Sequence, residues 1–310
     1  MIDLIDALYL KFYLRKKFIG SRLIRRLILK SINCCLILIL NRFTYLFWYL
    51  LVLLRKESGR CCRQSVVFSM TSYPKRIKGT WKSVLCLILQ KDISAVVYLW
   101  LSKDDYKCAN KLPLSLRLLE RYGLNIIIKD DNLRSHKKYM YLKEILRNND
   151  VILVDDDLIY PSNMSRQLVD SSREKNKIRA RYTKEMIRNE SGMICLYNSW
   201  SVTDKNKYKN DLLFFCTGGG TLLPKGDYNE IWFDQEAAMK VTPKADDLWL
   251  NAVARYTNKK IEIAAHTPVC LESTILNKDR LSNYNLSGGN DIQIQSINAY
   301  FEEKYRFTPF

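Results

Sequence analysis

Three consecutive aspartates, Asp155, Asp156 and Asp157, directly follow an apolar run at 151–154. Carboxylates at the end of a buried segment are unfavourable unless a positive charge meets them. If the backbone stays extended, Asp155 and Asp157 point to the same side. Oxygens in that arrangement suit a hard divalent cation, Mg²⁺ or Mn²⁺, which a diphosphate also ligates. The alternative is an acidic cap for a helix that begins after Pro161.

Two further segments carry groups that suit an anionic ligand. Residues 68–77 (FSMTSYPKRI) end an apolar run in a basic turn, which has the donors to hold a nucleotide base, a ribose or a phosphate. Residues 135–139 (SHKKY) offer cations that would neutralise a diphosphate. An ordinary basic turn and a solvated lysine pair are the alternative interpretations. The side chains concerned are Thr71, Ser72, Lys75 and Arg76 with Pro74, and His136, Lys137 and Lys138.

A glycine run and a pair of acids are the remaining groups that could bind a ligand or take part in a reaction. Residues 214–224 (FFCTGGGTLLP) place three glycines after an apolar run, and glycine lets backbone approach a ligand closely. Residues 242–256 (TPKADDLWLNAVARY) predict a helix whose first turn contains Asp246 and Asp247. The helix dipole alone favours acids there; alternatively, one of them acts as a general base at the rim of a pocket. Asp291 is expected to open a last helix.

Alternating strand-like and helix-like runs must position these groups. This β-α-β order predicts a doubly wound, mostly parallel sheet. Ligands of such sheets bind beyond the carboxyl ends of the strands, which is where the aspartates and the basic turn fall. Strands are expected at 65–72, 95–102, 124–131 and 150–157, with helices at 79–90, 112–123 and 137–148 between them.

Composition limits the class of protein. The chain has 310 residues, of which 47% are hydrophobic, so it can bury a large core and is not globally disordered. Its formal net charge is +18, from 50 Lys and Arg against 32 Asp and Glu, and this indicates an anionic partner. Residues 1–65 alone carry 13 Lys and Arg against three Asp and Glu. Because this excess lies beside the most apolar part of the chain, a membrane surface is favoured over nucleic acid.

The first 64 residues are expected to form a basic, apolar, helical segment that associates with a membrane, ahead of a second domain at 65–310. Residues 18–30 place a basic face opposite an aliphatic one, which is typical of an interfacial helix. Residues 32–54 are long enough to span a bilayer, although Arg42 in their middle opposes insertion by roughly 2.5–3.5 kcal/mol. We favour a monotopic anchor or re-entrant hairpin. A single type II span and a helical hairpin packed on the second domain are the alternatives.

The motifs occur in a fixed order: TSYPKRI (71–77), VDDDLIYP (154–161), CTGGGTLLP (216–224), ADDLW (245–249) and GGNDIQ (288–293). Together they resemble bacterial glycosyltransferases of the GT-A type, related to family 2, that build surface polysaccharides. The resemblance covers roughly residues 65–300. It implies a GT-A-like sheet and a metal-dependent, hexosyltransferase-like enzyme (EC 2.4). Such an enzyme moves a sugar from a UDP- or GDP-sugar to a hydroxyl of a glycan or lipid-linked acceptor, in assembly of capsule, O-antigen or lipooligosaccharide.

The resemblance also implies a role for each matching residue. Asp155 and Asp157 would form an Asp-x-Asp site for Mn²⁺ or Mg²⁺, with Asp157 preferred as the direct ligand. Asp247 or Asp246 would be the catalytic base. The residues assigned to the nucleotide, the diphosphate or the sugars are Thr71, Ser72, Pro74, Arg76, Asp130 or Asp131, Lys138, Asp156, Gly218, Gly219 and Gly220.

The reaction so implied separates charge, because the sugar becomes positive as the departing diphosphate becomes negative. Attack by a hydroxyl from the far face, assisted by a carboxylate base, would invert the anomeric centre. A bacterial enzyme that uses an activated nucleotide cannot work outside the cell, so we expect it at the cytoplasmic face of the inner membrane; the alternative is a type II membrane protein. A metal-dependent phosphotransferase or nuclease on a similar sheet is the rival function. The sequence contains no motif of nucleic-acid-binding proteins.

Overall fold

The computed structural model describes Ser31 and residues 65–91, 93–106, 112–169, 176–203, 212–264, 271–272 and 284–310. The helices expected at 18–30 and 32–54, which form most of the predicted membrane-associating segment, lie outside the described residues. Within the described ranges, no helix combines the length and the apolar character that a bilayer span requires.

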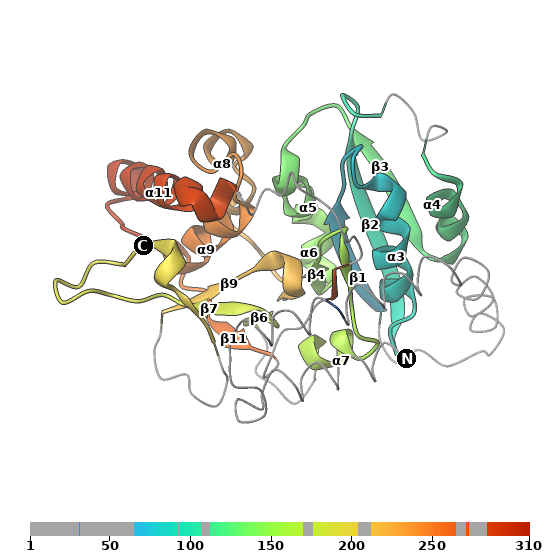
Figure 1. Cartoon of the computed structure of the whole chain (residues 1–310), viewed down its shortest axis with the longest axis horizontal. Coiled ribbons are helices and arrows are strands. Elements are labelled where there is room, and N and C mark those ends of the chain that lie inside the picture. The colour runs from blue at the N-terminus through green and yellow to red at the C-terminus, as the bar shows by residue number, and fades with distance from the viewer. Residues whose placement is uncertain are drawn as a thin grey trace.

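A seven-stranded sheet forms the centre of the described chain (Figure 1). Its strand order is β11-β6-β10-β4-β1-β2-β3. All strands run in one direction except β10, which pairs antiparallel with both of its neighbours. The expected mostly parallel α/β sheet is therefore confirmed. The strands are β1 (Ser65–Thr71), β2 (Ser94–Ser102), β3 (Leu124–Lys129), β4 (Val151–Leu153), β6 (Ile178–Ala180), β10 (Thr221–Leu223) and β11 (Ile261–Ile263).

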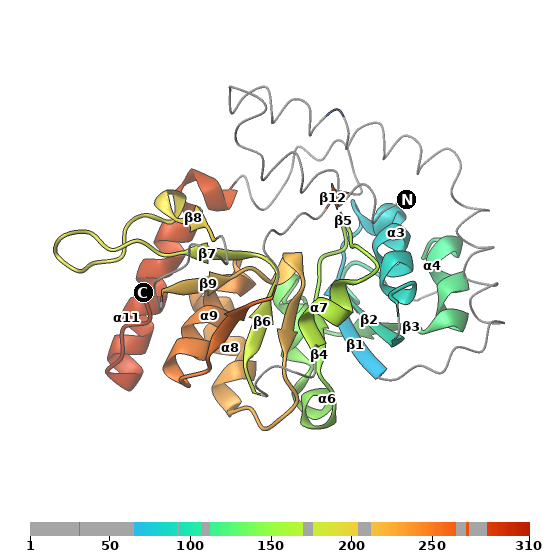
Figure 2. The ribbon, with the colours of Figure 1, turned by 90° about the horizontal axis from the view of Figure 1, so that it is seen from below.

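Helices cover both faces of the sheet, as a doubly wound fold requires (Figures 1 and 2). Alternate residues of β1 enter two separate cores, because successive side chains of a strand point to opposite faces. Val66 and Phe68 pack in the core of one face and Val67 in the core of the other. The first core contains α3 (Ile77–Ile88), α4 (Leu114–Leu119) and α7 (Met164–Val169). The second contains α5 (Lys137–Met140), α6 (Lys143–Asn148), α8 (Gln235–Val241), α9 (Asp246–Tyr256) and α11 (Asn290–Tyr305).

Two small sheets extend this framework. The three-stranded sheet has the order β8-β7-β9, and the two-stranded sheet pairs β12 with β5. The chain leaves β9, passes through the glycine loop η5 (Thr217–Gly219) and enters β10 of the large sheet. The glycine loop therefore lies at the junction between the two larger sheets. The strands are β5 (Leu158–Ile159), β7 (Thr183–Glu185), β8 (Ser201–Val202), β9 (Leu213–Phe215) and β12 (Leu271–Glu272).

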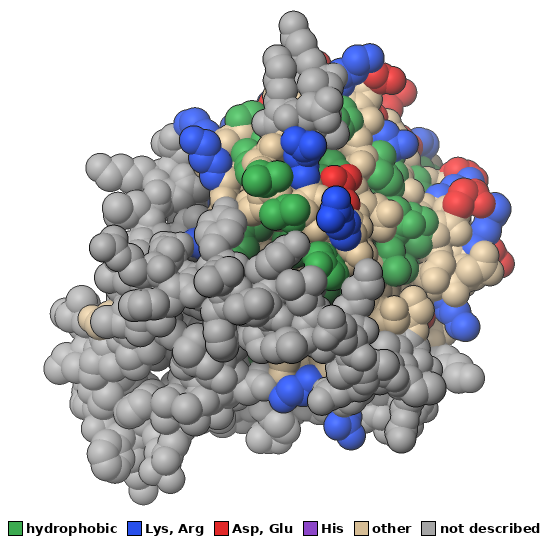
Figure 3. Space-filling model, turned by 90° about the vertical axis from the view of Figure 1, so that its right-hand side faces the viewer, with side chains coloured by type: hydrophobic (Ala, Val, Ile, Leu, Met, Phe, Trp, Pro, Cys, Tyr) green, Lys and Arg blue, Asp and Glu red, His purple; other side chains and the backbone are tan. Residues whose placement is uncertain are grey.

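The described surface mixes charges of both signs with apolar groups. On the face shown in Figure 3, Lys and Arg side chains are spread over the described part and interspersed with Asp and Glu side chains. The exposed large apolar residues include Met193 and Leu196, before η4 (Tyr197–Ser199), and Ile292 on α11. The positive charge of the described part is thus distributed over this face rather than gathered in one patch.

Two of the expected elements differ from the structure. The single helix expected at 137–148 is wrong, because the chain breaks at Tyr141 into α5 and α6. All four side chains of α5 are buried, so this turn is inserted into the core instead of lying along the surface as an amphipathic helix. The strand expected at 150–157 ends already at Leu153, and the three aspartates lie in and beside a turn.

Candidate active site

The three aspartates after β4 meet positive side chains, as their position in the sequence requires. Asp155 Oδ1 lies 2.9 Å from Lys138 Nζ. Asp157 Oδ2 lies 2.9 Å from an Arg76 guanidinium nitrogen, which also lies 3.1 Å from Asp156 Oδ1. The condition for Asp155 and Asp157 to point to one side, an extended backbone, is not met, because β4 ends at Leu153 and Asp156 and Asp157 lie in a turn. A turn relieves the repulsion of adjacent carboxylates because it lets Asp155 and Asp157 reach different cations.

Arg76, Ser72 and Asp156 tie the basic turn before α3 to the acidic turn. Asp156 is buried, and its carboxylate accepts hydrogen bonds from Ser72 Oγ and from Arg76. Ser83 Oγ donates to the Asp156 carbonyl at 2.9 Å. Burial raises the pKa of Asp156, and Arg76 and Ser72 oppose that rise. The structure thus gives these three residues partners within the protein, and their contact with a nucleotide stays a prediction.

Replacement of Arg76 should reveal how much of its role is structural. Arg76→Met leaves the buried Asp156 carboxylate without its counter-ion, so we expect the free energy of unfolding to fall by about 2–3 kcal/mol. This is below the loss for a fully buried pair because the Arg76 side chain keeps 17% exposure. Urea unfolding measures the effect, with Arg147→Met, in an exposed pair with Glu144, as the control. Equal stability of both variants would show that the Asp156 pair contributes nothing.

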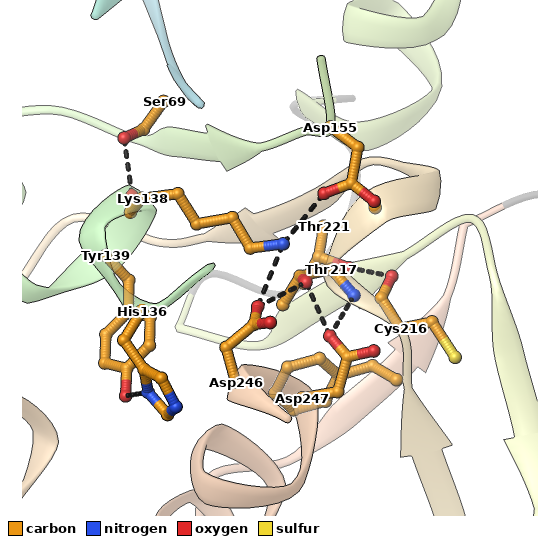
Figure 4. Close-up of polar contacts among 12 residues, drawn as sticks. Ser69, His136, Lys138, Tyr139, Asp155, Cys216, Thr217, Thr221, Asp246 and Asp247 are labelled. Carbon is orange, nitrogen blue, oxygen red and sulfur yellow. Dashed lines mark hydrogen bonds and ion pairs between the residues drawn. The ribbon is translucent and has the colours of Figure 1, made fainter. Parts of the chain in front are cut away.

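Lys138 joins the acidic turn to the start of α9. Its side chain is 4% exposed, and Nζ lies 2.9 Å from Asp155 Oδ1 and 2.9 Å from Asp246 Oδ2 (Figure 4). Ser69 Oγ in β1 donates to the Lys138 carbonyl and fixes α5 against the sheet. Burial alone would lower the pKa of Lys138, but Asp155 and Asp246 raise it well above its usual range. Lys138 is therefore a permanent positive charge between two carboxylates.

Thr217 of the glycine loop links both acids of the first turn of α9. Its backbone N–H donates to Asp247 Oδ1 at 2.9 Å. Its hydroxyl lies within hydrogen-bonding distance of both Asp247 Oδ1 and Asp246 Oδ2 (Figure 4). A hydroxyl has one proton and can donate to only one of these carboxylates at a time. The carboxylate that does not receive this proton faces the hydroxyl oxygen, so protonation of that carboxylate is favoured.

The environments of Asp246 and Asp247 push their pKa values apart. Burial, followed by the neighbouring charge of Asp246, raises the pKa of Asp247 to about 7. Burial would raise the pKa of Asp246, but the charge of Lys138 together with smaller effects of its neighbours and hydrogen bonds outweighs burial and holds that pKa below its usual range. Asp247 is partly exposed, and its Oδ2 has no hydrogen-bond partner among the described residues. Of the two acids, Asp247 is thus equipped to exchange a proton with a ligand at neutral pH.

The glycine loop packs directly on the acidic turn. A Cβ at Gly218 would lie 2.1 Å from Asp155 Oδ2, and one at Gly219 would lie 2.5 Å from Tyr182 Cβ. Tyr160 Oη donates to the Gly218 carbonyl at 2.7 Å and accepts from the Asp155 backbone N–H at 2.7 Å. Close packing within the protein therefore accounts for the small residues at these two positions. Their contact with a sugar stays a prediction.

Other predicted residues lie at the same edge of the sheet with separate partners. Thr71 Oγ1 donates to the Trp100 carbonyl at 2.8 Å, and Asp131 accepts a hydrogen bond from the Tyr141 hydroxyl. Pro74 lies in the turn before α3, as expected. Among the described residues, no side-chain hydrogen bond or ion pair joins Thr71 or Asp131 to the Lys138–Asp247 cluster, and their assignment to the nucleotide is still a hypothesis.

His136 is a structural residue. It is fully buried, its Nδ1 accepts from the Tyr139 hydroxyl at 2.7 Å, and its Nε2 donates to the Thr242 carbonyl at 2.6 Å. Burial lowers the pKa of His136, so the ring is neutral at pH 7. The idea that His136 neutralises a diphosphate is therefore wrong, because a neutral, fully hydrogen-bonded ring has no charge to offer.

The carboxylates of the acidic turn can be compared with what a divalent cation requires of its ligands. Within the described residues, no three or more His, Cys, Asp or Glu side chains gather in a way that could hold a metal. Magnesium-type ions, however, often bind one or two carboxylates and complete their shell with substrate phosphates. Asp155 fits this mode, because its side chain is 39% exposed and only Oδ1 is paired with Lys138. Asp157, at 15% exposure and bound to Arg76, fits it less well.

Comparisons with known proteins found similar chains among solved structures. No family model and no curated protein sequence matches the chain. Among solved structures, it is similar to a mannosyltransferase from Pyrobaculum calidifontis in complex with GDP-Man and Mn²⁺, at 12% identity and a TM-score of 0.46, over 90% of this chain and 76% of that one. It is also similar to a 4-diphosphocytidyl-2C-methyl-D-erythritol synthase from Anaerococcus prevotii, at 13% identity and a TM-score of 0.39, over 77% of this chain and 98% of that one. A UTP-bound UGPase from Acinetobacter baumannii matches at 10% identity and a TM-score of 0.37, over 78% of this chain and 94% of that one.

Sequence reasoning missed three residues in this part of the fold: Lys184, Tyr197 and Thr217. Lys184 lies in β7, which pairs with β9, and β9 leads into Thr217, the residue that binds Asp247. The Tyr197 ring lies 3.8 Å from the Lys184 ammonium. Thr217 was present in the motif CTGGGTLLP, but a threonine beside three glycines carries no signal of its own. Lys184 lies in a strand of only three residues, which is too short to show a periodic pattern.

Proposed function

We propose that this protein is a glycosyltransferase that moves a sugar from a nucleotide diphosphate sugar to a hydroxyl group of an acceptor. One observation carries the proposal: a partly exposed carboxylate with a pKa of about 7, Asp247, lies in the same polar cluster as Lys138 and the acidic turn. A base beside a fixed positive charge is what the transfer needs, since a hydroxyl must lose a proton while a diphosphate departs with negative charge.

Each residue of the cluster then has a distinct task. Asp247 accepts the proton of the attacking hydroxyl at Oδ2, while Thr217 holds Oδ1. Asp246 keeps Lys138 at the site and raises the pKa of Asp247, so that the base is strong enough to work at neutral pH. A divalent cation held by Asp155 would neutralise charge on the diphosphate. We infer an inverting transfer, in which the hydroxyl attacks the face of the sugar opposite the departing diphosphate.

The finer assignments follow from the motif resemblance and from the N-terminal residues. We infer a UDP- or GDP-sugar donor and an acceptor that is a glycan or lipid-linked, in bacterial surface polysaccharide assembly. Residues 1–64 would attach the enzyme to the cytoplasmic face of the inner membrane. The support for membrane attachment is the basic and apolar composition of that segment.

The decisive experiment screens nucleotide sugars with the full chain in the presence of Mn²⁺ or Mg²⁺ and measures release of UDP or GDP. We expect release from at least one donor, and its loss in Asp247→Ala and Asp155→Ala. Unchanged release in both variants would overturn the site. Metal-dependent hydrolysis of nucleic acid, without release of a nucleoside diphosphate from any donor, would support the nuclease alternative instead.

Asp246→Asn should shift the pH dependence of the reaction toward lower pH. The charge of Asp246 raises the pKa of Asp247, and its removal also frees the Lys138 ammonium, which lowers that pKa further. Both effects have the same sign, so the rise of kcat with pH should move down by roughly one pH unit. The measurement is kcat from pH 4.5 to 9. Asp234→Asn, at the N-cap of α8, serves as the control and should leave the profile in place. A profile of Asp246→Asn at or above that of the wild type would contradict the coupling.

A further inference from the structure

Lys184 is a second lysine on the Asp247 side of the site, and it differs from Lys138 in its surroundings. It lies in the middle of β7, with Phe214 of β9 directly across the strand pair. Its ammonium lies 3.8 Å from the centre of the Tyr197 ring. A cation over an aromatic face gains about 0.5–2 kcal/mol. The ring therefore fixes the position of the ammonium group without neutralising its charge.

The Lys184 ammonium has no carboxylate partner within the described part of the chain. Burial is the main influence on the pKa of Lys184 and lowers it; Cys216 and Asp247 oppose that change from nearby. Lys138, in contrast, forms ion pairs with two carboxylates at 2.9 Å each. A half-buried ammonium group has lost part of its hydration, and among the described residues no carboxylate compensates for that loss. An anionic ligand would compensate for it.

The position of Lys184 indicates which ligand it meets. Lys138 reaches the acid pair from the side of Asp155, where the diphosphate would lie, whereas Cys216 lies on the other side of Asp247 (Figure 4). The strand pairing places Lys184 near Cys216: β7 pairs with β9, and the Cys216 backbone N–H donates at 2.9 Å to the carbonyl of Tyr182, two residues before Lys184. The next residue, Thr217, binds Asp247. If Asp247 takes a proton from the acceptor, the groups on that side contact the acceptor rather than the donor.

We propose that Lys184, held over Tyr197, binds an anionic group of the acceptor, either a carboxylate or a phosphate. The identity of the ligand as the acceptor rests on the proposed function, but the anion site itself does not. A charged hydrogen bond in a half-buried position discriminates strongly against a neutral analogue, by roughly tenfold or more in affinity. The site would thus favour an acidic or phosphorylated sugar over its neutral counterpart.

Measurement of sugar binding tests the proposed anion site without any need for catalytic turnover. Isothermal titration of the full chain compares glucuronate and glucose 6-phosphate with glucose, which has the same ring without the charge. We expect one of the two anions to bind the wild type at least about tenfold more tightly than glucose. Tighter binding of glucuronate would identify a carboxylate as the ligand of the site, and tighter binding of glucose 6-phosphate would identify a phosphate. Equal dissociation constants for all three sugars would overturn the proposal.

Three variants locate the effect at Lys184. Lys184→Met should abolish the preference for the anion, and Lys184→Arg should retain most of it, since the charge is kept. Lys259→Met is the matched control, because Lys259 also lies over a tyrosine, Tyr228, at 4.9 Å. Persistence of the preference in Lys184→Met would overturn the proposal. Release of UDP or GDP from the donor screen is measured separately, so failure of the proposed function and failure of this anion site give different results.

Discussion

Asp247→Asn is expected to lower kcat by about 10²–10⁴-fold, the range over which a positioned general base accelerates a reaction. The amide cannot take up a proton at neutral pH, yet it keeps the shape of the carboxylate and one oxygen for the bonds from Thr217. Affinity for the nucleotide should be nearly unchanged, because Lys138 and Asp155 stay paired. The measurements are kcat for release of UDP or GDP and the dissociation constant of that nucleotide.

The wild-type protein should show the matching pH dependence. Burial and the charge of Asp246 raise the pKa of Asp247 to about 7. A general base works only when it is deprotonated, so kcat should increase with pH through about 7 and level off above it. The residual activity of Asp247→Asn should lack this increase. A variant with wild-type kcat, or a wild-type rate that is constant from pH 5 to 9, would contradict the role of Asp247.

Stability measurements separate loss of a base from loss of the fold. The folded pKa of Asp247, about 7, exceeds its ordinary value of 3.8, so the folded state keeps a proton that the unfolded state has lost between these values. The free energy of unfolding should therefore fall as the pH rises through this window. Asp247→Asn cannot ionise and should resist urea better than the wild type at pH 8. An inactive variant with lower stability at pH 8 would indicate a structural role instead.

The framework of the site follows from local patterns in the sequence. Short apolar runs alternate with helical ones, and this order alone places the ends of β1, β3 and β4 at one edge of the sheet. Lys138, Asp155 and Asp246 could therefore be named as candidates before their geometry was known. The contact of Lys138 with both acids could not be predicted, because it joins residues from three separate parts of the chain.

The sequence predicts that a cation meets the acidic turn, but it does not predict which cation. Three carboxylates after a buried strand predict that some cation must meet them. The structure supplies Lys138 and Arg76, whereas the sequence pattern is interpreted above as a site for a divalent metal ion. Arg76 reaches the acidic turn because β1 pairs with β4. Lys138 reaches it only because α5 is inserted into the core, and the break at Tyr141 that permits this insertion carries no sequence signal. Pairing with Lys138 still leaves room for a metal ion that is shared with a phosphate, because among the described residues only Oδ1 of Asp155 has a cationic partner.

Lys138→Met is expected to lower the free energy of unfolding by about 3–5 kcal/mol at pH 7, the cost of removing one partner of a buried ion pair. The loss comes mainly from Asp246, at 9% exposure, because Asp155 is exposed enough to turn toward water. In the wild type Lys138 holds the pKa of Asp246 below its usual range, so this stabilisation exists at neutral pH and disappears as the pH falls and Asp246 takes up a proton. The difference between variant and wild type in urea unfolding should therefore shrink toward pH 3.

The same variant should move the activity profile in the direction opposite to Asp246→Asn. The Lys138 ammonium lowers the pKa of Asp247, so its loss should raise that pKa and shift the rise of kcat to higher pH. Lys103→Met, in an exposed pair with Asp130, is the matched control and should change neither stability nor profile. Opposite shifts from Lys138→Met and Asp246→Asn can arise only if both charges act on one titrating base. Shifts of the same sign would mean that Asp247 is not the group that limits the reaction at low pH.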